Sequence, residues 1–336
     1  MSSLTVWYDD PQVYGGEPSG SNPGNTPVGG IGYTNRTHSI SPAIMTHSSH
    51  PLLRSLRASL LCGAALLLPP ALSAQGGSSG PLQEASRLDV QGATKEARVI
   101  IQHVIDTASV PLARSAAQRA MAVSYAFDGD CANAVKYEEM VMAYWKTREQ
   151  AEPQNAFYQQ GEMANEAARL CIDAGAIDVA EKYYRMGAEL GLREPEPKTH
   201  PKSLWDFRLT HALARIAARR GNAAEAQRQV AAARQVLDAD PKMASAQERF
   251  FPYLTGYVAL YTNDLATAET ELTRALAIPG NATDPFMTAL LAMTYEQLQH
   301  PDRARALYEK AYAMATAHNP PSAFARPFAR KKLGMM

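Results

Sequence analysis

The stretch AMTYEQLQHPDRARALYEKAY, residues 292–312, decides the fold. It holds two runs of good helix formers separated by a short polar turn at residues 299–302. The second run carries Ala304, and a large residue, Tyr308, follows four positions later. Residues four apart share one face of a helix. The stretch therefore predicts two antiparallel helices joined by a tight turn.

Four earlier segments have the same layout, namely 122–138, 167–184, 212–230 and 256–272. The five segments share an alanine: Ala134, Ala180, Ala226, Ala268 and Ala304. A small residue stands twelve positions before each: Ala122, Ala168, Ala214, Gly256 and Ala292. Seven positions after each stand Val141, Gly187, Ala233, Ala275 and Ala311. Where helix axes approach to about 8–10 Å, only small side chains fit between the backbones, so this spacing predicts closely packed helix pairs.

Composition supports an all-α domain. From Gly92 onward Ala, Leu, Glu, Arg and Gln dominate, and no Val/Ile/Thr run bounded by turn residues suggests a strand. The 336-residue chain is 46% hydrophobic, enough to bury a core. Its 33 Lys and Arg balance 33 Asp and Glu, which excludes a dedicated nucleic-acid binder with its usual basic excess.

The spacing resembles the tetratricopeptide repeat, with small residues at positions 8 and 27, Ala at 20, and aromatic residues at 11 and 24. The last segment matches best, with Tyr295 and Tyr308 in the aromatic slots. The resemblance covers residues 116–317 and implies a right-handed solenoid of about five helix-turn-helix repeats plus flanking helices. The shared alanines, however, lie 46, 46, 42 and 36 residues apart instead of 34. An irregular helical bundle therefore stays open as the alternative.

The resemblance also implies a concave groove that binds a protein or peptide, lined by positions 2, 5 and 9 of each first helix. The groove residues carried over by register are Glu162, Asn165, Arg169, Arg208, His211, Arg215, Phe250, Tyr253 and Tyr257. Arg forks and aromatic faces would suit a peptide with carboxylate and apolar groups. The alternative is a solvated charged face beside ordinary core aromatics. Pro252 is expected to start or kink its helix.

Catalytic motifs are absent: the sequence contains no HExxH, GxSxG, GxxxxGK[ST] or CxxC. We therefore expect a non-catalytic adaptor or scaffold without metal or cofactor. Two alternatives stay open. One is a helical enzyme using Glu162, Arg208, His211 and Arg215, and the other is a permanent structural subunit of an envelope complex.

The N-terminal part divides into three segments. Residues 1–44 read as a disordered leader, with translation starting instead at Met45. Residues 45–74 have the basic start, apolar run and small-residue exit of a secretory signal, and the 11-residue run 58–68 is too short to span a membrane. Residues 75–90 are expected to be a linker. The signal predicts an exported protein, periplasmic or extracellular, with no membrane span left after cleavage.

The rest comprises a helical domain, 91–317, and a basic tail, 318–336, which we expect to cap the last repeat or dock an acidic partner or membrane. Cys131 and Cys171 are placed by register at one edge of neighbouring repeats. They could form a disulfide in an oxidising compartment or remain buried thiols. The sequence leaves the partner and the oligomeric state undefined.

Overall fold

The computed structural model describes residues 80–335, which are helical throughout, with no strand in that range. The predicted leader and signal, and residues 75–79 of the predicted linker, lie outside the described residues. The helices are α1 (Pro81–Gln91), α2 (Thr94–Thr107), α3 (Pro111–Phe127), α4 (Cys131–Lys146), α5 (Pro153–Asp173), α6 (Ile177–Leu192), α7 (Lys202–Arg219), α8 (Ala223–Ala239), α9 (Pro241–Gln247), α10 (Phe251–Tyr261), α11 (Leu265–Ala277), α12 (Pro285–Gln297), α13 (Pro301–Met314) and α14 (Pro320–Lys332). The all-α prediction is confirmed.

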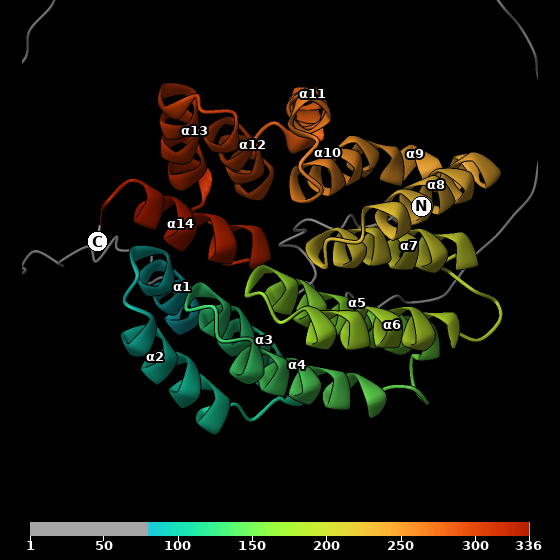
Figure 1. Ribbon diagram of the computed structural model, residues 1–336. Helices are drawn as coiled ribbons and strands as arrows, with labels where there is room; N and C mark the ends of the chain where they lie inside the picture. Colours follow the sequence, from blue (N-terminus) through green and yellow to red (C-terminus); the bar gives the residue numbers. More distant parts are fainter. Residues whose placement is uncertain (1–79, 336) are drawn as a thin grey trace, which may run out of the picture. The chain divides into compact units, whose positions relative to one another are not determined.

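The five predicted segments are five helix pairs: α3–α4, α5–α6, α7–α8, α10–α11 and α12–α13. Figure 1 shows the first helix of each pair nearer the centre and the second outside. The five shared alanines are buried, with exposed fractions of 0–4%. The two other sets of small residues are buried as well. Small residues thus stand where the paired helices touch, as the sequence predicts.

The turns between paired helices use a left-handed residue. Gly129, Gly175 and Gly221 have φ of 70°, 86° and 72°, and Asn263 and Gln299 take the same role at 64° and 61°. This is the usual way to end a helix, because glycine enters the left-handed region without a steric penalty. The chain can then reverse within three residues.

Glycine also permits a close contact between α5 and α6. A Cβ on Gly161 would lie 2.9 Å from the carbonyl oxygen of Gly187, so only glycine fits there. The Trp205 ring of α7 packs against Gly161 of α5 and Gly191 of α6. A Cβ on Gly191 would lie 2.0 Å from this ring. Trp205 is 1% exposed and anchors the next helix pair to this one.

Departures from a 34-residue period have structural causes. Short α9 and a 3₁₀ turn, Glu248–Phe250, are inserted before α10, and Pro252 lies in the first turn of α10. The expectation that Pro252 starts its helix is confirmed. Between α6 and α7 runs a loop over residues 193–201.

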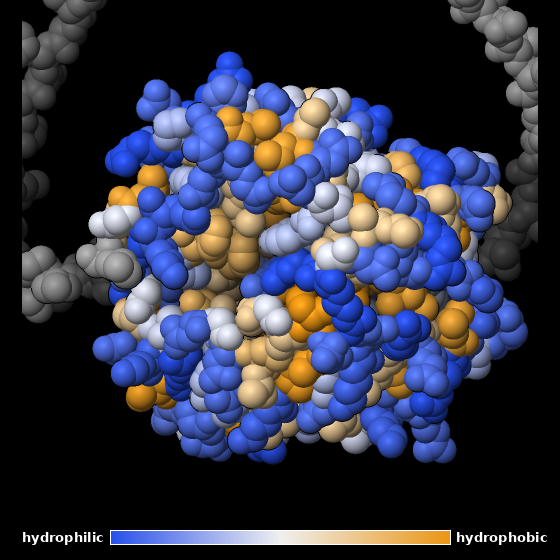
Figure 2. Space-filling view, in the orientation of Figure 1, coloured by the Kyte–Doolittle hydropathy of each residue, from blue (hydrophilic) through white to orange (hydrophobic). Residues whose placement is uncertain are grey.

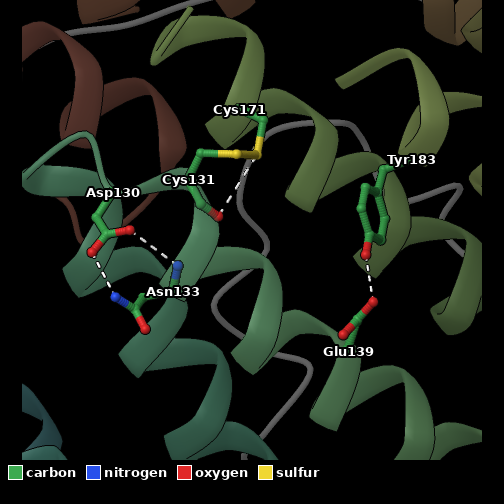
Figure 3. The surroundings of a disulfide bond; sticks show 6 residues. All are labelled: Asp130, Cys131, Asn133, Glu139, Cys171 and Tyr183. Atoms are coloured by element: carbon green, nitrogen blue, oxygen red, sulfur yellow. Dashed lines mark hydrogen bonds between the residues drawn. A yellow bond between two sulfur atoms is a disulfide. The ribbon is translucent and has the colours of Figure 1, made fainter. Parts of the chain in front are cut away.

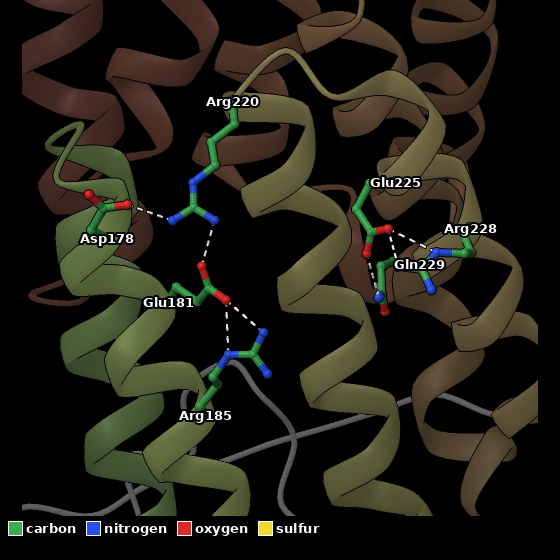
Figure 4. Close-up of polar contacts among 7 residues, drawn as sticks. All are labelled: Asp178, Glu181, Arg185, Arg220, Glu225, Arg228 and Gln229. Atoms are coloured by element: carbon green, nitrogen blue, oxygen red, sulfur yellow. Dashed lines mark hydrogen bonds and ion pairs between the residues drawn. The ribbon is translucent and has the colours of Figure 1, made fainter.

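Solvent-exposed ion pairs also join consecutive helix pairs. Arg220, at the end of α7, reaches Asp178 and Glu181 of α6, with nitrogen–oxygen distances of 2.5 Å, and Arg185 completes the cluster (Figure 4). Such exposed pairs contribute roughly 0–1 kcal/mol each. They add little to the stability that buried packing provides.

The last helix, α14, closes the stack onto its beginning. It packs on α12 and α13 and also contacts α1, α3 and α5 (Figure 1). Arg326 of α14 donates to the Val90 carbonyl in the last turn of α1, and its Nη1 donates to the Tyr312 carbonyl at 3.0 Å. His318 meets the buried Asp89 carboxylate at 2.8 Å and stacks on Phe127.

Two boundary predictions are therefore corrected. The segment 75–90 is not a linker throughout, because α1 begins at Pro81 and packs Ala85 into the core. The segment 318–336 is not a free tail, because Ala323, Ala325 and Ala329 are buried under neighbouring helices. Its expected role as a cap on the last repeat is what the structure shows.

Candidate functional site

The predicted groove residues face the inside of the stack but are not an open surface. Asn165, Arg208, His211, Arg215, Phe250, Tyr253 and Tyr257 are only 0–7% exposed, while Glu162 and Arg169 are partly exposed. The expectation of an exposed groove at these positions is wrong. Tyr253 packs on Phe286, which packs on Phe324 of α14 with ring centroids 4.9 Å apart. These ring contacts join α10, α12 and α14 on the inner side of the stack.

Arg215 organises the buried polar network. Its two terminal nitrogens donate to the hydroxyls of Tyr184 at 2.9 Å and Tyr253 at 3.3 Å, and its guanidinium also faces the Tyr257 ring. One turn later Arg219 donates to the Tyr257 hydroxyl at 3.3 Å. Tyrosine hydroxyls and ring faces surround the guanidinium groups of the buried Arg215 and the half-buried Arg219.

The enzyme alternative requires Glu162, Arg208, His211 and Arg215 to act together, but the structure gives them different partners. Arg208 forms an ion pair with Glu162, so both charges are neutralised. Burial, with the charge of Arg215 adding to it, lowers the pKa of His211 well below its ordinary value. None of Glu162, Arg208, His211 and Arg215 lines the cavities described below. The Arg208–Glu162 ion pair joins α5 to α7, and the buried His211 lies in the same inner layer.

A second buried cluster joins the first two of the five pairs. Arg119 of α3 holds Glu166 of α5 in a bidentate ion pair with distances of 2.9 and 2.7 Å. Glu138 of α4 is fully buried beside it. Burial, reinforced by the charge of Glu166, raises the pKa of Glu138 well above its ordinary value.

A cavity of about 260 Å³ opens where α14 faces the ends of α3 and α5. Figure 2 shows tan and orange residues in a hollow left of the centre, in the part of the view where Figure 1 draws α14. We call this the α14 cavity. Its walls are mainly apolar and aromatic, and its lining residues are Ala126, Phe127, Asp128, Gly129, Leu170, Asp173, Ala174, Pro320, Ala323, Phe324, Pro327, Phe328 and Lys331.

Asp173 is the unusual group in the α14 cavity. It is partly exposed, and no hydrogen bond within the described residues uses its carboxylate. Burial raises its pKa to about 6, although Arg169, Arg215 and Arg219 oppose the shift. A carboxyl group whose pKa is raised by burial in an aromatic cavity is typical of binding and catalytic sites.

Sequence reasoning missed this site, but a signal was present. Asn165, Arg169 and Asp173 stand four apart on one stripe of α5, and Arg219 follows Arg215 four positions later. Extending the predicted groove positions by one helical turn leads to Asp173 and Arg219. No repeat pattern indicates that Phe324 and Phe328 form the opposite wall.

A disulfide joins the first two of the five pairs. Cys131, at the start of α4, is bonded to Cys171, near the end of α5, with an S–S distance of 2.02 Å and a Cα–Cα distance of 4.8 Å (Figure 3). The bond lies near the α14 cavity, since Asp173 follows Cys171 by two residues. Of the two states left open by the sequence, the structure contains the disulfide and not the free thiols.

Comparisons with known proteins add no relative: no family model and no curated protein matches this chain. Residues 80–335 contain no cluster of His, Cys, Asp and Glu that could hold a metal ion. The same residues include no helix with the length and apolarity needed to cross a bilayer.

Proposed function

We propose that the chain is an exported, non-catalytic interaction protein with a tetratricopeptide-like solenoid that binds a segment of another protein. The five stacked helix pairs with their buried small residues support this architecture. Arg208 and His211 are buried, Glu162 is paired with Arg208, and none of the three lines the described cavities, which disfavours the enzyme alternative.

The α14 cavity carries the proposal. Its aromatic walls, Phe127, Phe324 and Phe328, surround a volume of about 260 Å³, which suits one large apolar side chain of a partner. Binding energy at protein interfaces concentrates on a few such anchors in desolvated pockets. Lys331 and Asp128 at the cavity edge supply charges that would orient the rest of the segment.

Export is supported by two independent features. Residues 45–74 have the three parts of a secretory signal. Disulfides persist in oxidising compartments, and the Cys131–Cys171 bond fits a periplasmic or extracellular protein.

Blocking the α14 cavity tests the proposal. Ala174 is exposed in the turn after α5 and lines the cavity, so Ala174→Trp fills the cavity without disturbing the core. The control is Ala231→Trp, on the exposed side of α8. The tagged protein and both variants are used to recover partners from envelope extracts of the source cells.

The partner that the unmodified protein recovers should be lost with Ala174→Trp and retained with Ala231→Trp. Circular dichroism must show that both variants keep their helical content. Equal recovery of the partner by the two folded variants would overturn the assignment of the α14 cavity as the binding site.

A further inference from the structure

The carboxylate of Asp173 is a hydrogen-bond acceptor that a molecule in the α14 cavity can reach. Asp173 lines the cavity and is partly exposed, and no group within residues 80–335 donates a hydrogen bond to its oxygens. The side-chain atoms of these residues that are both closed to solvent and unpaired do not include either carboxylate oxygen, so both oxygens face open space. The acceptor is therefore available to a partner.

The carboxylates at two other cavities are already engaged. A cavity of about 620 Å³ at the start of α5 is lined by Asp240, which accepts from a serine hydroxyl at 2.6 Å and from a backbone amide of α9 at 3.1 Å. A smaller cavity of about 190 Å³ shares Asp128 with the α14 cavity and also includes Asp89. Asp89 accepts from a serine hydroxyl at 2.8 Å, and Asp128 pairs with Arg98 at 2.6 Å. Asp173 differs from all three because its carboxylate has no such partner.

The position of Asp173 is unfavourable for an unpaired charge. It is the last residue of α5, where the helix dipole presents its negative end. Burial also disfavours the charged form and raises the pKa of Asp173 to about 6. A carboxylate that lowers stability in this way and accepts no hydrogen bond from the fold is typical of a residue kept for binding.

Aromatic rings form the walls next to this acceptor. Phe324 and Phe328 of α14 stack with centroids 5.1 Å apart and an angle of 18° between their planes. Phe127 of α3 lines the same cavity and stacks on His318. Aromatic rings pack best against other rings, either offset and parallel or edge to face. The volume of about 260 Å³ leaves room for one aromatic side chain of a partner.

The disulfide joins two walls of the α14 cavity. Cys131 begins α4, two residues after Gly129, which lines the cavity. Cys171 follows directly on Leu170 of α5, and Asp173 comes two residues later (Figure 3). The covalent bond therefore keeps these walls together before a partner arrives, which lowers the entropic cost of binding.

The charges around the acceptor favour a neutral donor over an ion. The positive charges of Arg169, Arg215 and Arg219 act on Asp173 and oppose the rise in its pKa. Lys331 adds a further positive charge at the cavity. A lysine or arginine of a partner would meet this excess of positive charge, and a carboxylate would approach the ionised Asp173. A neutral hydroxyl or ring N–H avoids both repulsions.

We propose that the partner segment is anchored by a tyrosine or tryptophan side chain, whose ring packs among the phenylalanines of the α14 cavity and whose hydroxyl or ring N–H donates to Asp173. This inference rests on the proposed function, because it names the side chain that the α14 cavity takes. Buried tyrosine hydroxyls and tryptophan N–H groups usually have a hydrogen-bond partner, and both residues are enriched among the anchors of protein interfaces.

NMR titration of the purified protein with neutral amino-acid derivatives, which detects millimolar binding, tests the inference. The probes are the N-acetyl amides of tyrosine, tryptophan, phenylalanine and lysine, together with O-methyltyrosine and 1-methyltryptophan in the same form. The two methylated probes keep the ring but lack the donor. Tyrosine or tryptophan should bind at least about fivefold more tightly than its methylated form and than phenylalanine, as expected for a hydrogen bond to a charged group.

Variants locate the binding. Asp173→Leu removes the acceptor, so the parent and methylated probes should bind equally. Ala174→Trp fills the cavity and should abolish binding of all the aromatic probes. Asp178→Leu is the matched control, because the Asp178 side chain is 93% exposed, and it should leave every affinity unchanged.

Four results would each overturn the inference: equal binding of the parent and methylated probes, tightest binding of the lysine derivative, binding that Ala174→Trp leaves unchanged, or no binding of any probe. The comparison of parent and methylated probes needs only the unmodified protein, so it does not depend on the folding of a variant. The proposed function is judged separately, by recovery of the partner with Ala174→Trp. A cavity that binds its partner through another kind of side chain would therefore be recognised.

Discussion

Asp173 gives the sharpest prediction about the α14 cavity. Its ordinary pKa is 3.8, and burial raises it to about 6 in the folded protein. The folded state therefore holds the proton more tightly than the unfolded chain, and the protein loses stability as the pH rises from about 4 to about 6. The full difference amounts to about 3 kcal/mol, at about 1.36 kcal/mol per pH unit.

Asp173→Asn replaces the carboxyl group with a neutral group of the same shape. At about pH 8 the variant should be more stable than the unmodified protein by about 3 kcal/mol. At about pH 4.5, where Asp173 is protonated in the folded state, the linkage relation leaves a gain of only about 1 kcal/mol. Urea unfolding followed by circular dichroism at both pH values measures the free energy of unfolding.

Asp178→Asn is the matched control, because the Asp178 side chain is 93% exposed. Its effect should be below about 1 kcal/mol and nearly independent of pH. If Asp173→Asn lowers stability at about pH 8, the three neighbouring arginines outweigh burial and the reasoning is refuted. If Asp173→Asn stabilises the protein while the recovery of the partner falls, Asp173 lowers the stability of the folded protein but is needed for binding. Functional residues often show this combination.

Three further predictions concern the scaffold. Gly191→Ala should lower the free energy of unfolding by about 1–3 kcal/mol, because the new Cβ would lie 2.0 Å from Trp205; a loss that is the same in a Trp205→Phe background would argue against this contact. Replacing Cys131 and Cys171 with Ala should lower the free energy of unfolding by about 4 kcal/mol, because the disulfide closes a loop with a sequence separation of 40 residues. If both thiols could be alkylated in the unreduced, unfolded protein, the disulfide would be contradicted. Glu138→Gln should leave stability at neutral pH unchanged or higher, because burial disfavours the charged form of this carboxyl group. A drop above about 1 kcal/mol in a urea titration would contradict this reasoning.

The helix pairs could be predicted from the sequence because close helix packing is a local steric requirement. A Cβ on Gly256 would lie 2.7 Å from Leu272 Cγ, and the residue is glycine for that reason. Ala168 and Ala292, at the equivalent places of two other pairs, are buried for the same reason. The same steric requirement recurs in each helix pair. It therefore produces a regular spacing of small residues, which is visible in the sequence alone.

Whether the side chains of the inner face are buried or exposed could not be predicted in the same way. Register places Arg215 and Tyr253 on the inner face correctly, yet both are buried. Their burial depends on how far the stack curves and on where the C-terminal segment lies. Glu138 shows a related limit: it stands where the repeat pattern expects an aromatic residue, and only its neighbours Arg119 and Glu166 explain a carboxyl group there.

Closure by α14 accounts for the difference between the predicted groove and the cavity. On α5 the stripe of Asn165, Arg169 and Asp173 runs from the covered interior to the open end. The aromatic rings of α14 cover its beginning through Phe286 and Tyr253, whereas Asp173 at its end faces a cavity. Carboxylates, arginines and aromatic rings therefore lie in the core at one end of α5 and border a cavity at the other. Because the raised pKa of Asp173 belongs to the accessible end, the binding that we propose there would not require a partner to displace α14.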